Sequence, residues 1–185
     1  MDLQQLLVKW NIKCDINTAL AMWNESHRSY HNLNHLNDLI SQINENKSNF
    51  SEKEYEKLIL TAIFHDIVYD PSSSTNEANS AKFLMECAVD KKNNDILDVE
   101  KMILDTKSHT SSNKLSEAFN SYDMNIVERT FEELLEWENG ISEEFSVYTK
   151  EQYKEGRLKF LESLLDKYTH NTENLLQLID YVKNY

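Results

Sequence analysis

The chain has 185 residues, a length that suits one domain, and we expect a single domain over 1–185. Its 32 acidic and 19 basic residues give a formal net charge of −13. This charge disfavours long nucleic acids and anionic membranes as partners, because both are bound through clustered lysine and arginine. Apolar residues make up 40% of the chain, enough for a core, and the presence of only two Gly and one Pro favours helices over hairpins.

The first third of the chain predicts three helices from the spacing of its apolar residues. Asp2 is a plausible N-cap for the first helix, and Asn17 for the second. Asn32 can cap a third helix, which carries one apolar stripe. His31 and His35 are four residues apart around its first turn, so both imidazoles can face the same direction.

The fourth predicted helix begins with a capping box, in which Ser51 is the N-cap and Glu54 the N3 residue. An apolar run follows and ends at the pair His65 and Asp66. Such a run is also compatible with a buried strand, but the capping box and the length from 52 to about 68 favour a buried central helix. Pro71 and the serines after it predict a loop.

Helical spacing continues in the rest of the chain, and polar segments separate the helices. The sequence therefore predicts an all-α protein, folded as a compact helical bundle. The helical segments expected here are 77–88, 96–106, 114–137, 149–168 and 172–184.

The surroundings expected for the protein follow from its cysteines and its N-terminus. Cys14 and Cys87 lie in unrelated contexts without metal-site or redox-motif spacing, so we expect two small buried residues in a reducing compartment. The first residues lack the charged and apolar regions of a signal peptide, and no apolar run approaches the roughly 18 residues of a membrane span. A cytoplasmic location without a membrane partner is the expectation.

The pair His65 and Asp66 is the feature that composition explains least. A carboxylate beside an imidazole at the end of an apolar helix is costly unless a positive or hydrogen-bonding group compensates it, and a divalent cation does so for both side chains. The alternative is that the pair caps the helix or forms a core hydrogen bond. An aspartate is unfavourable at the negative end of the helix dipole, which counts against a simple cap.

Several segments of the sequence resemble the HD-domain metal-dependent phosphohydrolases, in particular a group of small predicted members. Residues 28–35 (RSYHNLNH) resemble R-x-Y-H-N-x-x-H, and residues 64–71 (FHDIVYDP) resemble F-H-D-x-x-Y-D-P. Residues 106–109 (TKSH) resemble T-K-x-H, and residues 123–126 (DMNI) resemble the end of D-x-D-L-x-I-L-G. A weaker match at 156–161 (GRLKFL) resembles G-R-x-x-x-L. The segments follow the family's order and cover most of the chain.

The resemblance implies an HD-type helical domain that binds one divalent metal ion. A shell of two imidazoles and two carboxylates suits Mn, Mg, Fe, Co or Ni and does not select among them. The chain departs from the family pattern at Ser121, which replaces the first acid of D-x-D, and at Glu128, which replaces the closing glycine. The ligands that the resemblance implies are His35, His65, Asp66 and Asp123.

Four more residues are candidates for the same site. The resemblance favours a role there for His31, as a ligand, a proton donor or a structural hydrogen-bond donor. Lys107 and His109 belong to the T-K-x-H match and are candidates for a phosphate contact, with His109 also a further metal ligand. Arg28 can contact an anionic substrate or pair with one of the chain's many acids.

These observations lead to one functional hypothesis and two alternatives. The hypothesis is a phosphomonoesterase or phosphodiesterase that acts on a small, nucleotide-like phosphorylated substrate through a metal-activated water, with Asp66, His31, Lys107 and Arg28 as catalytic residues. The first alternative is a di-iron oxygenase of the HD type, in which His31 and His109 complete a second iron site. The second is a non-catalytic helical adaptor that keeps its metal for folding.

Overall fold

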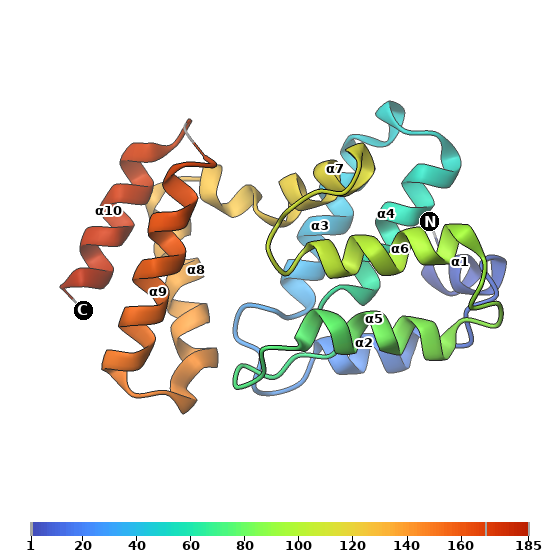
Figure 1. The fold of residues 1–185 in the computed structure, drawn as a ribbon, viewed down its shortest axis with the longest axis horizontal. Coiled ribbons are helices and arrows are strands. Elements are labelled where there is room, and N and C mark those ends of the chain that lie inside the picture. The colour runs from blue at the N-terminus through green and yellow to red at the C-terminus, as the bar shows by residue number, and fades with distance from the viewer. Residues whose placement is uncertain (1, 169, 185) are drawn as a thin grey trace. The chain divides into compact units, whose positions relative to one another are not determined.

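Helices account for the regular structure of this protein. A computed structural model describes residues 2–168 and 170–184, and within these ranges it contains helices and no β-strand (Figure 1). The all-α class predicted from the sequence is therefore confirmed. The chain divides into two compact units, Met1–Asp123 and Met124–Tyr185. The single domain over 1–185 stays a prediction.

Within the described residues, the first unit contains seven α-helices and one short 3₁₀ helix, and the second contains three α-helices and two short 3₁₀ helices. In the part of the chain that the structure describes, none of these helices is long and apolar enough to cross a membrane. The first unit contains α1 (Leu3–Lys9), α2 (Ile16–Trp23), α3 (Leu33–Glu45), η1 (Lys47–Asn49), α4 (Glu52–Phe64), α5 (Asn76–Cys87), α6 (Asn94–Asp105) and α7 (Lys114–Asp123). The second contains η2 (Asn125–Glu128), α8 (Phe131–Glu144), η3 (Phe145–Val147), α9 (Lys150–Leu165) and α10 (Thr172–Lys183).

Most predicted helix starts are confirmed by their caps. Asp2 accepts a hydrogen bond from the backbone N–H of Gln5, Asn32 caps α3, and the capping box at Ser51 forms as predicted. The cap of α2 is Asp15, two residues before the predicted Asn17. The side chains of Asp2, Asn32 and Ser51 fix where α1, α3 and α4 begin, because the first N–H groups of a helix have no partner within it; Asp15 makes no such hydrogen bond.

Two boundaries predicted from the sequence are wrong. The central helix α4 ends at Phe64 and does not continue to residue 68, so His65 and Asp66 lie beyond it. The segment 114–137 is broken into α7, η2 and the start of α8. Thr130 causes the interruption between η2 and α8, because it forms a capping box with Glu133 and so starts α8.

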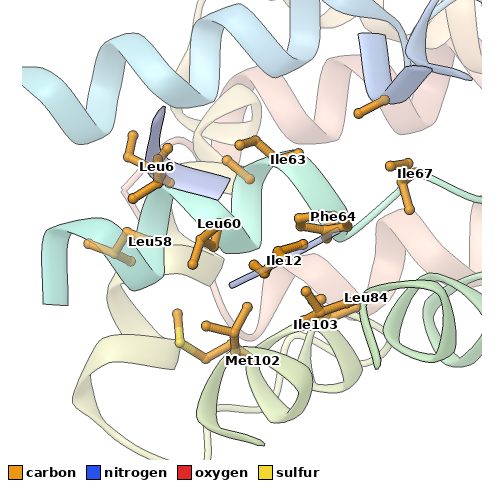
Figure 2. Packing of buried hydrophobic residues seen from close by; sticks show 14 of the residues in the cluster. Leu6, Ile12, Leu58, Leu60, Ile63, Phe64, Ile67, Leu84, Met102 and Ile103 are labelled. Carbon is orange, nitrogen blue, oxygen red and sulfur yellow. The ribbon is translucent and has the colours of Figure 1, made fainter. Parts of the chain in front are cut away.

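Helix α4 forms the centre of the first unit. Every residue from Tyr55 to Phe64 is buried, and α3, α5, α6 and α7 all pack against this helix. Figure 2 shows side chains of α4, among them Ile63, in one cluster with Met102 and Ile103 of α6. An apolar surface on all sides is what a helix enclosed by neighbours requires. The end of α4 is therefore fixed by packing, and so is the position of the residues that follow it.

The two cysteines lie near a short contact between the N-terminal segment and the end of α5. Ile12 pairs with Ala88 in an isolated antiparallel bridge, which brings Cys14 and Cys87 close together. Both thiols are reduced; Cys14 is buried and Cys87 is half-buried. Burial and the Cys87 thiol raise the pKa of Cys14 to about 11, which disfavours its reactive thiolate form. The burial predicted from the sequence is confirmed for Cys14 but not for Cys87, which is partly exposed because it lies at the end of α5.

Candidate metal centre

His65 and Asp66 lie directly beyond the C-terminal end of the buried helix α4. The last carbonyl groups of a helix have no partner within it and must find one outside. The indole Nε1 of Trp23 donates to the carbonyl oxygen of Ile63 at 2.8 Å. The ring of His65 turns back onto its own helix, with Nδ1 at 3.1 Å from the carbonyl oxygen of Ala62. The end of α4 thereby orients the imidazole.

The contact with Ala62 decides which nitrogen of His65 is open to a ligand. A carbonyl oxygen can only accept, so Nδ1 donates, and the neutral ring carries its lone pair on Nε2. The side chain is 1% exposed, and its ring centroid is 5.4 Å from those of Trp23 and Phe119. Metal-binding histidines are usually oriented in this way, by a partner on the second ring nitrogen.

Three ligand atoms converge at this end of α4. One from each of His35, His65 and Asp66 lies within 4.8 Å of the other two. His65 Nε2 is 3.2 Å from Asp66 Oδ2 and 3.6 Å from Asp123 Oδ1. His35 Nε2 is 3.1 Å from the same oxygen of Asp123. The structure therefore brings together the four ligands that the family resemblance implied, with Asp123 beside the mutually close set of three.

The orientation of these ring nitrogens argues against hydrogen bonds, and the closest distances between the ligand atoms are compatible with a shared cation. Among residues 2–168 and 170–184, neither His35 Nε2 nor His65 Nε2 has a partner aligned for a hydrogen bond, although both atoms are buried. Two ligands about 2.1 Å from one cation lie about 3.0 to 3.4 Å apart at octahedral or tetrahedral angles. The closest contacts at this site, 3.1 and 3.2 Å, fall in that range. Buried polar atoms without partners are costly, and a cation would supply the missing partner.

The carboxylates and imidazoles at this site shift one another's pKa values. Burial opposes the charged form of His65, but the Asp66 and Asp123 carboxylates outweigh it and raise the pKa of His65 well above its ordinary value. Burial also opposes ionisation of the two acids, yet His65 and the other imidazoles hold the pKa of Asp66 and Asp123 below the ordinary value. Both acids are thus ionised at neutral pH, as metal ligands must be.

Asp123 is the last residue of α7, a position that directs its carboxylate toward α3 and α4. Gln42 of α3 donates to the carbonyl oxygen of Tyr122 at 3.3 Å and so ties the end of α7 to α3. Ser121, where the family pattern has an acid, is exposed and donates to the carbonyl oxygen of Ala118. The substitution at 121 therefore leaves the contacts of Asp123 with the imidazoles intact.

Two further histidines flank the four predicted ligands, each beside one carboxylate. His31 Nε2 lies 3.9 Å from Asp66 Oδ2, and His109 Nε2 donates to Asp123 Oδ2 at 3.3 Å. The side chains of His31 and His109 are 21% and 19% exposed, against 6% for His35. The outer histidines thus form a rim that solvent can reach, whereas the inner pair is enclosed.

The two rim histidines lie on irregular backbone. His31 precedes the N-cap Asn32 and is not part of α3, so the predicted helical pairing with His35 does not occur; the two rings still meet, with centroids 5.9 Å apart. His109 has a φ of +48°, a conformation that histidine adopts more readily than most residues. Asp105 accepts hydrogen bonds from Ser112 and so holds the loop that carries His109.

Arg28 lies beneath the site and not at its opening. Its side chain is fully buried, and all three guanidinium nitrogens donate hydrogen bonds to other groups of the chain. The acceptors are Glu25 and the backbone carbonyls of His31, Asp66 and Ile67. Of the two roles considered from the sequence, the structure shows the pairing with an acid, Glu25, and the other guanidinium nitrogens of Arg28 hold the backbone.

Lys107 contacts the loop that follows Pro71. Its ammonium group donates to the carbonyl oxygen of Ser74 and lies 3.8 Å from a carboxylate oxygen of Glu77. The side chain is 56% exposed. Lys107 is thus an exposed cation that contacts this loop, and its predicted contact with a phosphate stays a prediction.

Comparisons with protein-family models, curated proteins and solved structures found no match for this chain.

Three residues near the site were not singled out in the sequence. Trp23 and Phe119 enclose the ring of His65, and Asp105 holds the loop of His109. Trp23 and Phe119 look like ordinary core residues in the apolar pattern, and Asp105 looks like one more solvated acid. The only signal that could have marked Asp105 is its place directly before the T-K-x-H segment.

Proposed function

We propose that this chain is a metal-dependent phosphohydrolase, a phosphomonoesterase or phosphodiesterase acting on a small nucleotide-like substrate. The observation that carries the proposal is the convergence of ligand atoms from His35, His65 and Asp66, with Asp123 beside both imidazoles. The choice of a phosphoryl substrate is supported by the resemblance of four sequence segments to HD-domain phosphohydrolases.

The proposed centre would hold a divalent cation through two imidazoles and two carboxylates. This donor set suits Mn, Mg, Fe, Co or Ni, and the buried ring nitrogens of His35 and His65 are donors that such an ion would use. When bound, a divalent cation lowers the pKa of a coordinated water and polarises a phosphoryl group. The negative charges of Asp66 and Asp123 would stabilise the ion in this enclosed position.

Asp66, the two rim histidines and Lys107 supply the other parts of hydrolysis in this proposal. Asp66 accepts a hydrogen bond from the attacking water and so orients it. His31, partly exposed beside Asp66, donates a proton to the leaving oxygen. His109 and Lys107 offset negative charge on the phosphoryl oxygens.

The net charge of −13 supports a small substrate over a polymer. A polynucleotide is held by many phosphate contacts along a basic surface, whereas a small phosphoester needs charge only at the reacting group. A divalent cation with one or two positive side chains meets that smaller requirement.

A substrate screen tests the proposal. The chain is loaded with each candidate metal and assayed against nucleotides and simple phosphoesters, with Asp66→Ala as the inactive control. Release of phosphate or of a nucleoside by the parent chain alone supports the proposal. If no phosphoester is cleaved under any metal, or if Asp66→Ala cleaves as well as the parent, the proposal is wrong.

A di-iron oxygenase is the second candidate, and one observation favours it. Each of the two carboxylates has an outer imidazole beside it, His31 at Asp66 and His109 at Asp123, which is the arrangement that a second iron site would need. Metal analysis separates the candidates. Two tightly bound irons per chain, with oxygen consumption and no phosphate release, would favour the oxygenase.

A non-catalytic adaptor would keep the same ligands for folding alone. It predicts that metal raises the stability of the chain while no substrate is turned over. An Asp66→Ala variant that folds normally and retains every measurable function of the parent would exclude the enzyme.

A further inference from the structure

Arg28 makes more contacts with the backbone around the proposed metal centre than any role in binding substrate would require. Its Nη1 donates to the carbonyl oxygen of His31 at 3.1 Å and to that of Asp66 at 2.7 Å. Its Nη2 donates to the carbonyl oxygen of Ile67 at 3.0 Å. One side chain therefore joins two segments that are more than thirty residues apart in the sequence.

The accepting carbonyl groups are ones that the helices leave without a partner. Asp66 and Ile67 follow the end of α4, and His31 precedes the N-cap of α3. Backbone oxygens at such positions need donors from elsewhere in the chain, and a cation at a helix C-terminus also interacts favourably with the helix dipole. Arg28 donates hydrogen bonds to these carbonyl groups and places a positive charge near the C-terminal end of α4. The positive charge also offsets the unfavourable position of the Asp66 carboxylate at that end.

The guanidinium group is held in one orientation by three other side chains. Trp23 and Tyr69 each have their ring centroid 5.4 Å from its central carbon, and Glu25 accepts from Nε at 3.1 Å. The ring of Tyr69 also lies against His31, with centroids 4.5 Å apart. The guanidinium plane is therefore fixed, and with it the directions of its N–H groups.

Starting from the metal centre of the proposed function, we infer that Arg28 is a positioning residue of that centre. By holding the backbone carbonyls of Asp66 and His31 on one guanidinium group, it sets the distance between the Asp66 carboxylate and the His31 imidazole. It does not contact substrate or metal. A lysine would keep the charge and lose the planar arrangement of donors, so it could not hold both carbonyls in place.

A purely structural arginine is the alternative, and the chain offers a matched control for it. Arg157 is also buried, also bonded to a carboxylate, that of Glu138 at 2.7 Å, and also lies over an aromatic ring, that of Trp137. It belongs to the second unit, which contains none of the predicted ligands. Replacing either arginine by lysine should lower stability, but only the change at Arg28 should alter the metal centre.

The experiment compares the parent chain with Arg28→Lys and Arg157→Lys. Co²⁺ affinity is measured by calorimetry, the visible absorption of bound Co²⁺ reports the geometry of its ligands, and urea unfolding without metal reports stability. We expect Arg28→Lys to weaken Co²⁺ binding about 10- to 100-fold, the usual effect of removing a group that orients a ligand, and to change the absorption bands. We expect Arg157→Lys to bind Co²⁺ within about twofold of the parent.

Arg28→Lys with the affinity and spectrum of the parent would overturn the inference. If this variant does not fold, Glu25→Gln takes its place, since it loosens the guanidinium from the side away from the metal; an affinity equal to that of the parent would again overturn it. A parent chain that binds no Co²⁺ would overturn both the inference and the metal centre. A parent that binds Co²⁺ but cleaves no phosphoester would overturn the proposed function alone.

Discussion

Each unit of this protein buries a cluster of charged groups, and the two clusters differ in how those groups are satisfied. In the second unit, the carboxylate of Glu138 accepts from the hydroxyl of Tyr153 at 2.6 Å and from Nε of Arg157 at 2.7 Å. In the first unit, the carboxylates of Asp66 and Asp123 lie 3.2 and 3.1 Å from Nε2 of His65 and of His35, and these two nitrogens are not aligned to donate to them.

The difference separates an ion pair from a set of metal ligands. In an ion pair, a donor points at an acceptor, as at Glu138. In a ligand set, the lone pairs of all members point at a common position, so neighbouring atoms are close without being bonded to each other. In the second cluster, Nη2 of Arg157 is buried and has no hydrogen-bond partner among residues 2–168 and 170–184, but this atom belongs to a cation that lies over Trp137. We therefore expect metal to act on the first cluster alone.

Asp66→Ala should have the largest effect on the first cluster. Removing a direct ligand should cost more than the 10- to 100-fold typical of residues that only orient ligands, so we expect more than a 100-fold loss of both Co²⁺ affinity and phosphoester hydrolysis. Calorimetry and a phosphate-release assay measure the two losses. The control is Glu138→Gln, which should lower stability and leave both properties unchanged; if it weakens them as much, the clusters do not differ as we describe.

Metal should stabilise the parent chain through the first cluster. At a free Co²⁺ concentration of 100 times the dissociation constant, the free energy of unfolding should rise by about 2.7 kcal/mol. In His65→Ala this rise should be absent, because the variant lacks a ligand. Urea unfolding with and without Co²⁺ measures the effect, and an equal rise in parent and variant would show that the ion binds elsewhere.

Tyr153→Phe should affect the second cluster alone. It removes the hydroxyl that donates to Glu138, a hydrogen bond to a charged group, and should lower the free energy of unfolding by about 1.5 kcal/mol. Co²⁺ affinity should stay within about twofold of the parent. A larger loss of affinity, seen by calorimetry, would connect the two clusters.

Metal binding by the first cluster should depend on pH. Because the pKa of His65 is raised by Asp66 and Asp123, its imidazole carries a proton near neutral pH that the metal must displace. Co²⁺ affinity should therefore rise with pH up to the pKa of His65 and fall about tenfold for each unit below it. Calorimetry from pH 6 to pH 9 measures this slope; a flat profile would exclude His65 as a ligand.

Local rules account for the parts of the structure that the sequence predicted. The caps at Asp2, Asn32 and Ser51 depend on residues within a few positions, and the structure confirms them. The end of α4 could not be placed in this way. The helix ends at Phe64, where the ring of His65 takes up the carbonyl oxygen of Ala62 and the indole of Trp23, which comes from a distant segment, takes up that of Ile63.

The candidate site was also predicted only in part. The family resemblance identified His35, His65, Asp66 and Asp123, and the structure brings these side chains together. The role of Arg28 could not be predicted, because a basic residue near a predicted site looks the same in sequence whether it contacts substrate or backbone. Only its burial and its three backbone acceptors show that Arg28 contacts the backbone.

The most direct test of the metal centre is the X-ray absorption spectrum of the Co²⁺-loaded chain. Our interpretation predicts one Co²⁺ per chain with nitrogen and oxygen ligands and the scattering of two imidazole rings, reduced to one ring in His35→Ala. A shell of oxygen ligands alone, or a spectrum that does not change in His35→Ala, would contradict it.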